Sequence, residues 1–457
     1  MLANRWSLIF FLLPTVLAAQ QKSDVQQILE RLERLERENH NLAAEVRLLR
    51  EELAASRGVP APAVSSEASS GTGPPAPLDE RLAVQEQRIE EQAQTKVEAS
   101  QRLPLTLTGM VLFNAFLNGR SSGGQQYPTA AAPLSGNALV GGATLRQSVI
   151  GLKFQGPTVW GGGHVNGSLY LDLFAGTASS LNHLVRLRVA TVEIDWKNRS
   201  IMVGQDKPIV APREPNSLAQ VGVSPLTGAG NLWLWQPQIR FEQRVALGRQ
   251  AGLRLQAGVY QTSEPSYVSR GGDSASIVPG PRPALEGRFE FWRQFGEGAR
   301  IEIAPGFHTS TSHVAGVSVP SHLFTLDWLI QPIAKIQFTG TFFNGRNAAG
   351  LGGLHQGFTV FGDNRVQAIR ATGGWAQLSY LATKRLSFNL QGGQESDRGA
   401  DLLNGDIHRN LMYAGNAIYR LGPNVLVGLE ASQVRTSYIL GPSRLNNHYD
   451  LALGYLF

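Results

Sequence analysis

From residue 105 to the C-terminus, polar and apolar residues alternate with a period of two. The clearest example is the stretch 164–173, where every second residue is polar or hydroxylated and the residues between are Val, Gly or Leu. This period places the two kinds of residue on opposite faces of a β-strand. The apolar face then meets either a second sheet, as in a soluble sandwich, or lipid, as in a membrane barrel whose polar face lines water.

The alternation predicts sixteen antiparallel strands that close into an all-β transmembrane barrel over residues 104–457. The strands are predicted at residues 105–113, 144–156, 162–174, 185–196, 199–206, 232–245, 252–262, 282–292, 299–307, 321–331, 334–344, 370–381, 385–394, 410–420, 424–435 and 447–457. The connections alternate in length. Long ones cover residues 114–143, 175–184, 207–231, 263–281, 308–320, 345–369, 395–409 and 436–446, and short ones include 197–198, 332–333, 382–384 and 421–423. Short turns on one side and longer loops on the other are expected of outer-membrane barrels. We expect the sheet to close, because an open sheet edge would leave unpaired backbone groups in hydrocarbon.

The N-terminus has the features of an export signal, predicted at residues 1–19. Arg5 supplies the positive charge, residues 6–13 form the apolar segment, and residues 16–19 offer a small-residue cleavage site. The apolar run is too short to span a bilayer, and a buried N-terminal helix is the alternative. Because no later stretch reaches about 18 uncharged apolar residues, entry into a membrane requires strands.

A heptad pattern in residues 20–55 predicts a helical coiled coil. Its a and d positions are Val25, Ile28, Leu32, Leu35, Asn39, Leu42, Val46, Leu49 and Leu53. A narrow apolar stripe on a Glu/Arg-rich helix is buried best against copies of itself, although a monomeric amphipathic helix has a similar stripe. Residues 56–77 are rich in Pro, Ala, Ser and Gly and predict a linker, and residues 78–103 predict a short helical segment.

The composition excludes several kinds of chemistry. The chain has 457 residues and no cysteine, so disulfides, thiolate metal sites and cysteine nucleophiles are ruled out. The net charge is +6, but the basic residues are scattered and form no nucleic-acid patch. Residues 119–123 match the G-x-S-x-G pattern, yet no helix is predicted to follow Ser121. Because the histidines are scattered as well, we expect no enzyme, cofactor or metal site.

The last predicted strand alternates regularly up to a terminal aromatic residue. The residues on its apolar face are Tyr449, Leu451, Leu453, Tyr455 and Phe457. This pattern resembles the terminal signal that the barrel assembly machinery recognises in bacterial outer-membrane barrels. We therefore expect that machinery to be a partner of this chain.

Several features together resemble the trimeric bacterial porins of the DcaP type. They are the heptads at 25–53, the segments 199–206 and 230–240, and the C-terminal YDLALGYLF. The resemblance covers the whole mature chain and implies a homotrimer in outer-membrane lipid, with the coiled coil in the periplasm. It implies diffusion of small hydrophilic solutes, for some members dicarboxylates. Asn39 departs from a trimeric stalk, because a buried Asn at an a position often favours a dimer.

The alternative function is structural. In that case the barrel anchors the protein and the coiled coil tethers the membrane to the periplasm or the cell wall. Deleting residues 20–100 distinguishes the two functions, because a pore keeps conducting without the coiled coil whereas a tether loses its role.

The resemblance also implies that the third long loop, residues 207–231, folds inward and narrows the pore; an ordinary surface loop is the alternative. The candidate pore-lining residues in this loop and on the polar faces of the strands are Lys153, Asp172, Lys207, Arg213, Glu214, Arg240, Glu242, Arg244, Arg254, Arg288, Lys335 and Arg385. Arginine presents a planar fork that suits carboxylates, so the basic members predict a mild preference for anions. The alternative is that each arginine pairs with a neighbouring acid, as Arg240 with Glu242 or Arg288 with Glu286, and only solvates the wall.

The strand predicted at 185–196 breaks the alternation. Arg186 and Arg188 share phase with Ala190, Val192 and Ile194, which would place both arginines on the lipid face. A β-bulge would turn them inward. The alternatives are a position above the membrane or at a contact between subunits.

Overall fold

The computed structural model describes residues 104–133, 138–175, 183–265, 277–279, 282–296, 298–314, 317–354, 357–363 and 365–457. The predicted signal peptide, coiled coil, linker and short helical segment, residues 1–103, lie outside the described residues. Within the described ranges, no helix is both long and apolar enough to cross a membrane.

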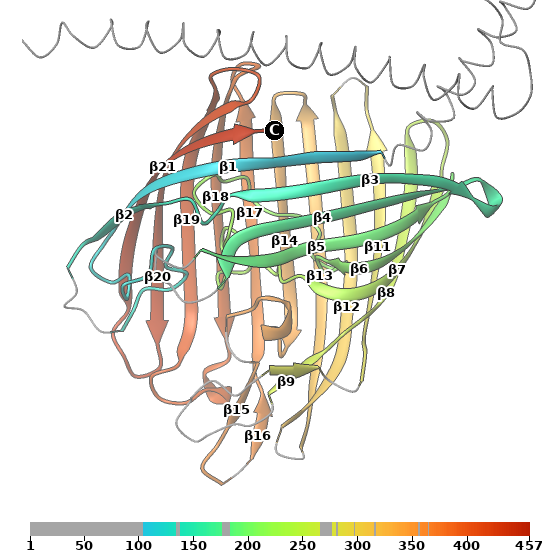
Figure 1. Cartoon of the computed structure of the whole chain (residues 1–457). Coiled ribbons are helices and arrows are strands. Elements are labelled where there is room, and N and C mark those ends of the chain that lie inside the picture. Colours follow the sequence, from blue (N-terminus) through green and yellow to red (C-terminus); the bar gives the residue numbers. More distant parts are fainter. Residues whose placement is uncertain are drawn as a thin grey trace, which may run out of the picture. The chain divides into compact units, whose positions relative to one another are not determined.

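The described residues form a closed antiparallel barrel of sixteen strands (Figure 1). The barrel strands are β1 (Leu105–Asn118), β2 (Val140–Thr144), β3 (Val149–Val159), β4 (Gly163–Ala175), β5 (Leu184–Asp195), β6 (Arg199–Asp206), β7 (Gln236–Ala246), β8 (Ala251–Tyr260), β11 (Ala284–Gln294), β12 (Arg300–Val314), β13 (Val317–Ile333), β14 (Ile336–Arg346), β17 (Arg370–Leu381), β18 (Leu386–Asp397), β19 (Ile407–Arg420), β20 (Val425–Tyr438) and β21 (Arg444–Leu456). β2 and β3 both pair with β1 and together make one strand of the barrel with a break at residues 145–148. Closure is made by β21, which pairs with β1.

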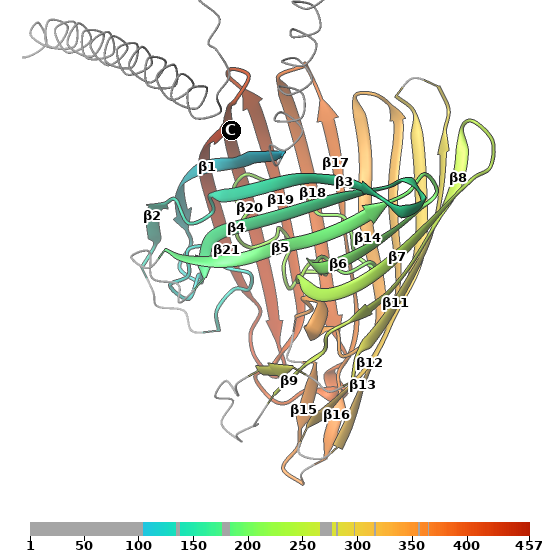
Figure 2. The same cartoon turned by 45° about the vertical axis from the view of Figure 1, so that its right-hand side comes forward.

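The two rims of the barrel differ. We call the rim that carries Phe457 and the short turns the turn end, and the opposite rim the loop end. The loop end carries two small hairpins (Figure 2), β9–β10 (Ser263–Pro265, Ile277–Pro279) and β15–β16 (Phe358–Val360, Val366–Ala368). Three single-turn 3₁₀ helices complete the elements: η1 (Trp160–Gly162), η2 (Ala349–Leu351) and η3 (Gly399–Asp401).

The fold confirms the predicted all-β barrel and corrects several strand limits. Most of the loop predicted at 308–320 is strand, because β12 runs to Val314 and β13 begins at Val317. β20 and β21 likewise extend into the region predicted as the loop 436–446. These extensions are rich in Ser, Thr and His, so they lack the polar–apolar alternation by which the strands were predicted. The backbone ladder continues there nevertheless.

The apolar faces of the strands point outward. In β21, Tyr449, Leu451 and Leu453 are exposed on the outer surface, whereas His448 and Asp450 between them are buried. The backbone of Phe457 exchanges two hydrogen bonds with Gly109 of β1, at 3.0 and 3.2 Å. The C-terminal pattern therefore lies at the seam where the barrel closes; its recognition by assembly machinery remains a prediction.

Replacing Gly109 with alanine should destabilise this seam. A Cβ atom at Gly109 would lie 2.4 Å from the carbonyl oxygen of Val149 and 2.7 Å from the ring of Phe457. Because the first of these contacts is with backbone, we expect a loss of about 1–3 kcal/mol in the free energy of unfolding. Denaturant unfolding in detergent micelles measures it. Gly415→Ala is the matched control, since its nearest neighbours lie 4.0 Å away; equal effects of both substitutions would contradict this view of the seam.

A salt bridge between a buried acid and a partly exposed arginine also anchors a loop at the loop end. Asp401 in η3 accepts two hydrogen bonds from the guanidinium of Arg370 at the start of β17, at 2.5 and 2.7 Å. These hydrogen bonds lower the pKa of the Asp401 carboxyl. The anchor therefore stabilises the loop above the ordinary carboxyl range and is lost only when the pH falls through that lowered pKa.

Candidate pore and its constriction loop

The segment 207–235, which we call the constriction loop, lies inside the barrel. It follows the inner wall through a series of hydrogen bonds. The Ile209 amide donates to the Tyr260 hydroxyl of β8 at 3.0 Å, and the Asn216 amide donates to Gln377 of β17 at 3.0 Å. The Ser217 hydroxyl donates to Glu430 of β20 at 2.5 Å. The inward course predicted for residues 207–231 is therefore what the structure has, and the surface-loop alternative is wrong.

Apolar side chains hold the loop against one side of the wall. One cluster joins loop and wall residues: Val210, Ala211, Leu232, Leu323, Phe343, Ala348, Leu351 and Ala371. A second contains Ala131, Leu226, Ala229, Trp375, Met412 and Val434. The wall members are apolar residues at inward positions, where a water-filled pore requires polar ones. These inward apolar residues are the sequence signal for a covered wall, and the sequence analysis missed it.

The barrel interior is consequently open along one side only. At mid-height, inward side chains of β11–β21 and of β1 are buried, including Asn114, Thr341, Gln377, Gln391, Ser432 and Asp450. Many inward side chains of β3–β8 are half-buried or exposed, including Lys153, Asn166, Ser168, Thr191, Arg240 and Arg254, although Ser200 and Met202 of β6 are buried. Because these accessible groups are polar or charged, the described interior has a water-accessible side bordered by β3–β8.

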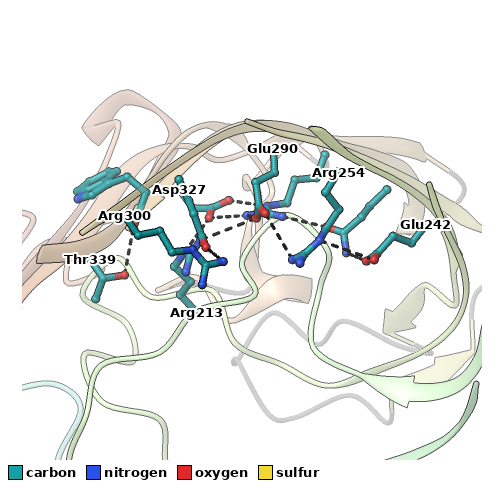
Figure 3. Close-up of polar contacts among 11 residues, drawn as sticks. Arg213, Glu242, Arg254, Glu290, Arg300, Asp327 and Thr339 are labelled. Atoms are coloured by element: carbon teal, nitrogen blue, oxygen red, sulfur yellow. Dashed lines mark hydrogen bonds and ion pairs between the residues drawn. The ribbon is translucent and has the colours of Figure 1, made fainter. Parts of the chain in front are cut away.

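A network of charges joins the start of the constriction loop to the wall (Figure 3). The Arg288 guanidinium, only 2% exposed, binds Asp327 and Glu290, each at 2.7 Å. Arg213 of the loop binds Asp327 at 2.9 Å and also contacts Glu302. Arg254, which is 37% exposed, extends the network toward the open side through Glu290 at 3.5 Å. Its arginines and carboxylates largely neutralise each other, so the network adds little net charge to the interior. Its main effect is to hold the constriction loop against the wall.

The ion pairs differ from those considered in the sequence. Arg288 pairs with Glu290 and Asp327, because Glu286 is bonded to His308 at 2.9 Å. Arg240 pairs with Asp206 on the adjacent strand at 3.2 Å rather than with Glu242. Pairing with acids is therefore common, but several of the partners, such as Asp206 and Asp327, lie on other strands.

A β-bulge turns Arg186 and Arg188 inward. The register of β4 and β5 shifts between Tyr170 and Leu171, which leaves Arg188 as the extra residue. Arg186 binds Asp172 at 2.6 Å, and Arg188 lies 3.5 Å from the same carboxylate. Both guanidinium groups also lie over the ring of Trp235, at 5.1 and 4.8 Å from its centroid. Of the three alternatives the structure has the bulge, which places two cations on one aspartate inside the barrel.

Gln147 clamps the constriction loop beside these arginines. The break between β2 and β3 brings its fully buried side chain inward. Its amide donates to the carbonyl of Ala219 at 2.7 Å and accepts from the amides of Val221 and Gly222 at 2.7 and 2.9 Å. The same loop turn binds the arginines, because the Val221 carbonyl accepts from Arg188 at 2.9 Å. Gln147 thus positions the loop segment that orients Arg188.

The remaining candidates lie at different heights. Lys207 and Glu214 form a salt bridge of 2.6 Å within the constriction loop, and Arg244 contacts Asp195 near the turn end. Lys153 is exposed at an inward position of β3 and makes no ion pair with the described residues. Lys335 and Arg385 are exposed in short turns, one residue before β14 and β18. The predicted placement of these last two in the strands of the wall is therefore corrected.

The site contains no recognisable catalytic arrangement in the part of the chain that the structure describes. Ser121 follows β1 in an irregular loop, without the strand–turn–helix that a nucleophile elbow requires. In that same part, no three His, Cys, Asp or Glu residues are grouped so that they could hold a metal ion.

The fold defines a porin-type barrel, and comparison with solved structures agrees. The chain is similar to the crystal structure of the outer membrane channel DcaP of Acinetobacter baumannii, with a TM-score of 0.62, 17% identity, and coverage of 77% of this chain and 97% of that one. It is also similar to the anion-selective porin from Comamonas acidovorans, with a TM-score of 0.50, 10% identity, and coverage of 77% and 99%. No family model matches the sequence. No curated protein matches it either.

Proposed function

We propose that this protein is a porin of the bacterial outer membrane through which small hydrophilic solutes diffuse. One observation carries the proposal: the closed barrel is apolar outside and keeps one polar, water-accessible side inside, along β3–β8. A barrel that served only as an anchor has no need of such a side. Single-channel conductance in planar bilayers tests the proposal, and a folded protein that never conducts would contradict it.

We further infer a mild preference for anions, including dicarboxylates. Arg186 and Arg188 share the single carboxylate of Asp172, and Lys153 lies unpaired among the described residues of the open side. This leaves an excess of positive charge beside the constriction loop, and the arginine fork suits carboxylates. The charge network around Arg288 adds little, because its charges compensate each other.

Replacing Arg188 with glutamine should shift the reversal potential in a KCl gradient toward that of a cation-selective pore. The substitution removes one positive charge at the narrowed part of the interior, where the local potential selects ions. Arg435→Gln is the matched control, because Arg435 is exposed on the outer face of β20. Equal shifts in the two variants, or none in Arg188→Gln, would contradict the assignment.

The remaining parts of the proposal concern location and assembly. The turn end faces the periplasm, where the coiled coil of residues 20–55 lies, and the chain assembles as a homotrimer after insertion by the barrel assembly machinery. Short turns on one rim and longer loops on the other support this orientation. A periplasmic tether is the second candidate function. It predicts that deleting residues 20–100 abolishes a cell-envelope role while conductance persists.

A further inference from the structure

A chamber of about 510 Å³ lies between the constriction loop and the wall toward the turn end. Residues 214–218, 220–221 and 224–225 of the loop form one side. The other side is formed by the inward faces of β13, β14, β17, β18 and β19 near their short turns. The volume lies within the range of sites that hold small ligands. A solute that has passed the loop enters this chamber next.

Five polar side chains that line the chamber make no hydrogen bond with any described residue. They are Gln220, Gln331, Gln337, Ser379 and Ser387. Gln220 is 97% buried, and its amide oxygen is without a partner. The Ser379 hydroxyl is also buried and unpartnered. A buried polar group without a partner is costly, so these groups require a ligand or water in the chamber.

Some inward side chains of the wall next to the chamber are bonded to each other or to the constriction loop. The Gln377 amide donates to Gln391 and exchanges hydrogen bonds with the backbone of Asn216. Asn416 donates to Glu430 at 3.0 Å. Single unpartnered polar atoms also occur elsewhere in the described barrel, as at Gln238 and Thr341, but the chamber groups five such side chains around one cavity.

The unpartnered groups form a continuous patch on the wall. Gln337 of β14 lies directly opposite Ser379 of β17, which lies opposite Asn389 of β18. Directly opposed side chains on neighbouring strands have Cβ atoms about 4.5–5.5 Å apart. Polar side chains this close together can bind different hydroxyl groups of one polyol chain. Amides and hydroxyls each offer a donor and an acceptor, as a ligand hydroxyl also does.

The chamber also carries positive charge. Arg188 lines it with a side chain that is 14% exposed, and the exposed Lys335 lies at its turn-end margin. The acid that lines it, Glu214, is already bound by Lys207 and by the Ser224 hydroxyl. The chamber therefore offers a carboxylate two cations and offers hydroxyls a patch of amide and serine groups.

We propose that this chamber is a binding site for small polyhydroxylated carboxylates of the aldonate type. The carboxylate binds a cation at the margin, and the hydroxyls bind Gln337, Ser379 and the neighbouring polar groups. The inference rests on the proposed function, because solutes reach the chamber through the pore. It goes further in requiring hydroxyl groups on the solute, which a simple anion preference does not.

Three six-carbon probes test the proposal: gluconate has both features, hexanoate only the carboxylate, and sorbitol only the hydroxyls. Titration calorimetry on the detergent-solubilised full chain should show gluconate binding at least about tenfold more tightly than either of the others, since each set of contacts contributes. The double substitution Gln337→Leu, Ser379→Ala should weaken gluconate about tenfold and leave hexanoate unchanged. Gln261→Leu, exposed at the loop end, is the control and should change neither.

The outcomes separate the two proposals. Equal affinity for gluconate and hexanoate would overturn the binding site, as would undiminished gluconate binding in the double variant. If the double variant does not fold, the three probes on the native chain decide alone. Gluconate binding without conductance would contradict the porin proposal only, whereas conductance without a preference for gluconate would contradict the binding site only.

Discussion

Replacing Arg288 with methionine should lower the free energy of unfolding by about 3–5 kcal/mol, because it leaves two buried carboxylates without their main cation. Glu290 and Asp327 are each 1% exposed, and Arg288 joins them at 2.7 Å. Arg213 also contacts both acids and compensates in part, which places the expected loss toward the lower end. Denaturant unfolding of the refolded barrel, followed by tryptophan fluorescence, measures it.

Arg300→Met is the matched control for this prediction. Arg300 also contacts an acid of the network, Glu302, but its side chain is 42% exposed. An ion pair with that exposure is screened by water and contributes about 0–1 kcal/mol. Adding Asp327→Asn to Arg288→Met should restore part of the lost stability, because it removes one of the uncompensated charges. Equal losses for Arg288→Met and Arg300→Met would contradict the assigned burial.

Replacing Gln147 with leucine should release the constriction loop from the wall and roughly double the conductance, because the current through a wetted tube rises with its open cross-section. The substitution leaves the Ala219 carbonyl and the Val221 and Gly222 amides buried without a partner. Each such group costs about 1–3 kcal/mol, so the loop is expected to leave this position rather than remain in it. The preference for anions should fall at the same time, since Arg188 loses its hydrogen bond to the Val221 carbonyl of the loop.

The control for the loop is Gln433→Leu on the outer face of β20. Gln433 also uses its amide, donating to Asn447 at 2.8 Å, but it lies outside the interior. Its substitution should leave conductance and selectivity unchanged. Unchanged conductance in Gln147→Leu, with the barrel folded, would show that the loop is held without this clamp.

The barrel itself was predictable because a period of two is a local property of the sequence. The strand at 199–206 was predicted with the limits that β6 has. In β5 the phase of Arg186 and Arg188 showed an irregularity, but it did not distinguish the bulge from the two alternatives. The strand ends at the loop end were not predictable in this way, since polar and apolar side chains do not alternate there. Backbone hydrogen bonds between neighbouring strands continue there, and they leave no pattern in the sequence.

The filling of one side of the interior depends on contacts between distant parts of the chain. Phe343 and Trp375 are inward and apolar, but whether such residues meet water or a loop depends on segment 207–235. Some ion pairs also depend on contacts between distant parts of the chain. Arg288 and Asp327 lie 39 residues apart and are brought together by the register of β11, β12 and β13. Pairs predicted within one strand therefore could not include Asp327.

The central claim is an aqueous passage along β3–β8 in a barrel whose other side is filled at mid-height. It is tested most directly by single cysteines in this cysteine-free chain. Ser168→Cys places a thiol on the open side, and Ser432→Cys places one beneath the constriction loop, where the serine is 7% exposed. A charged, membrane-impermeant thiol reagent added during single-channel recording should reduce the current through Ser168→Cys and leave Ser432→Cys unchanged. A current that responds only in Ser432→Cys, or equally in both variants, would contradict the claim.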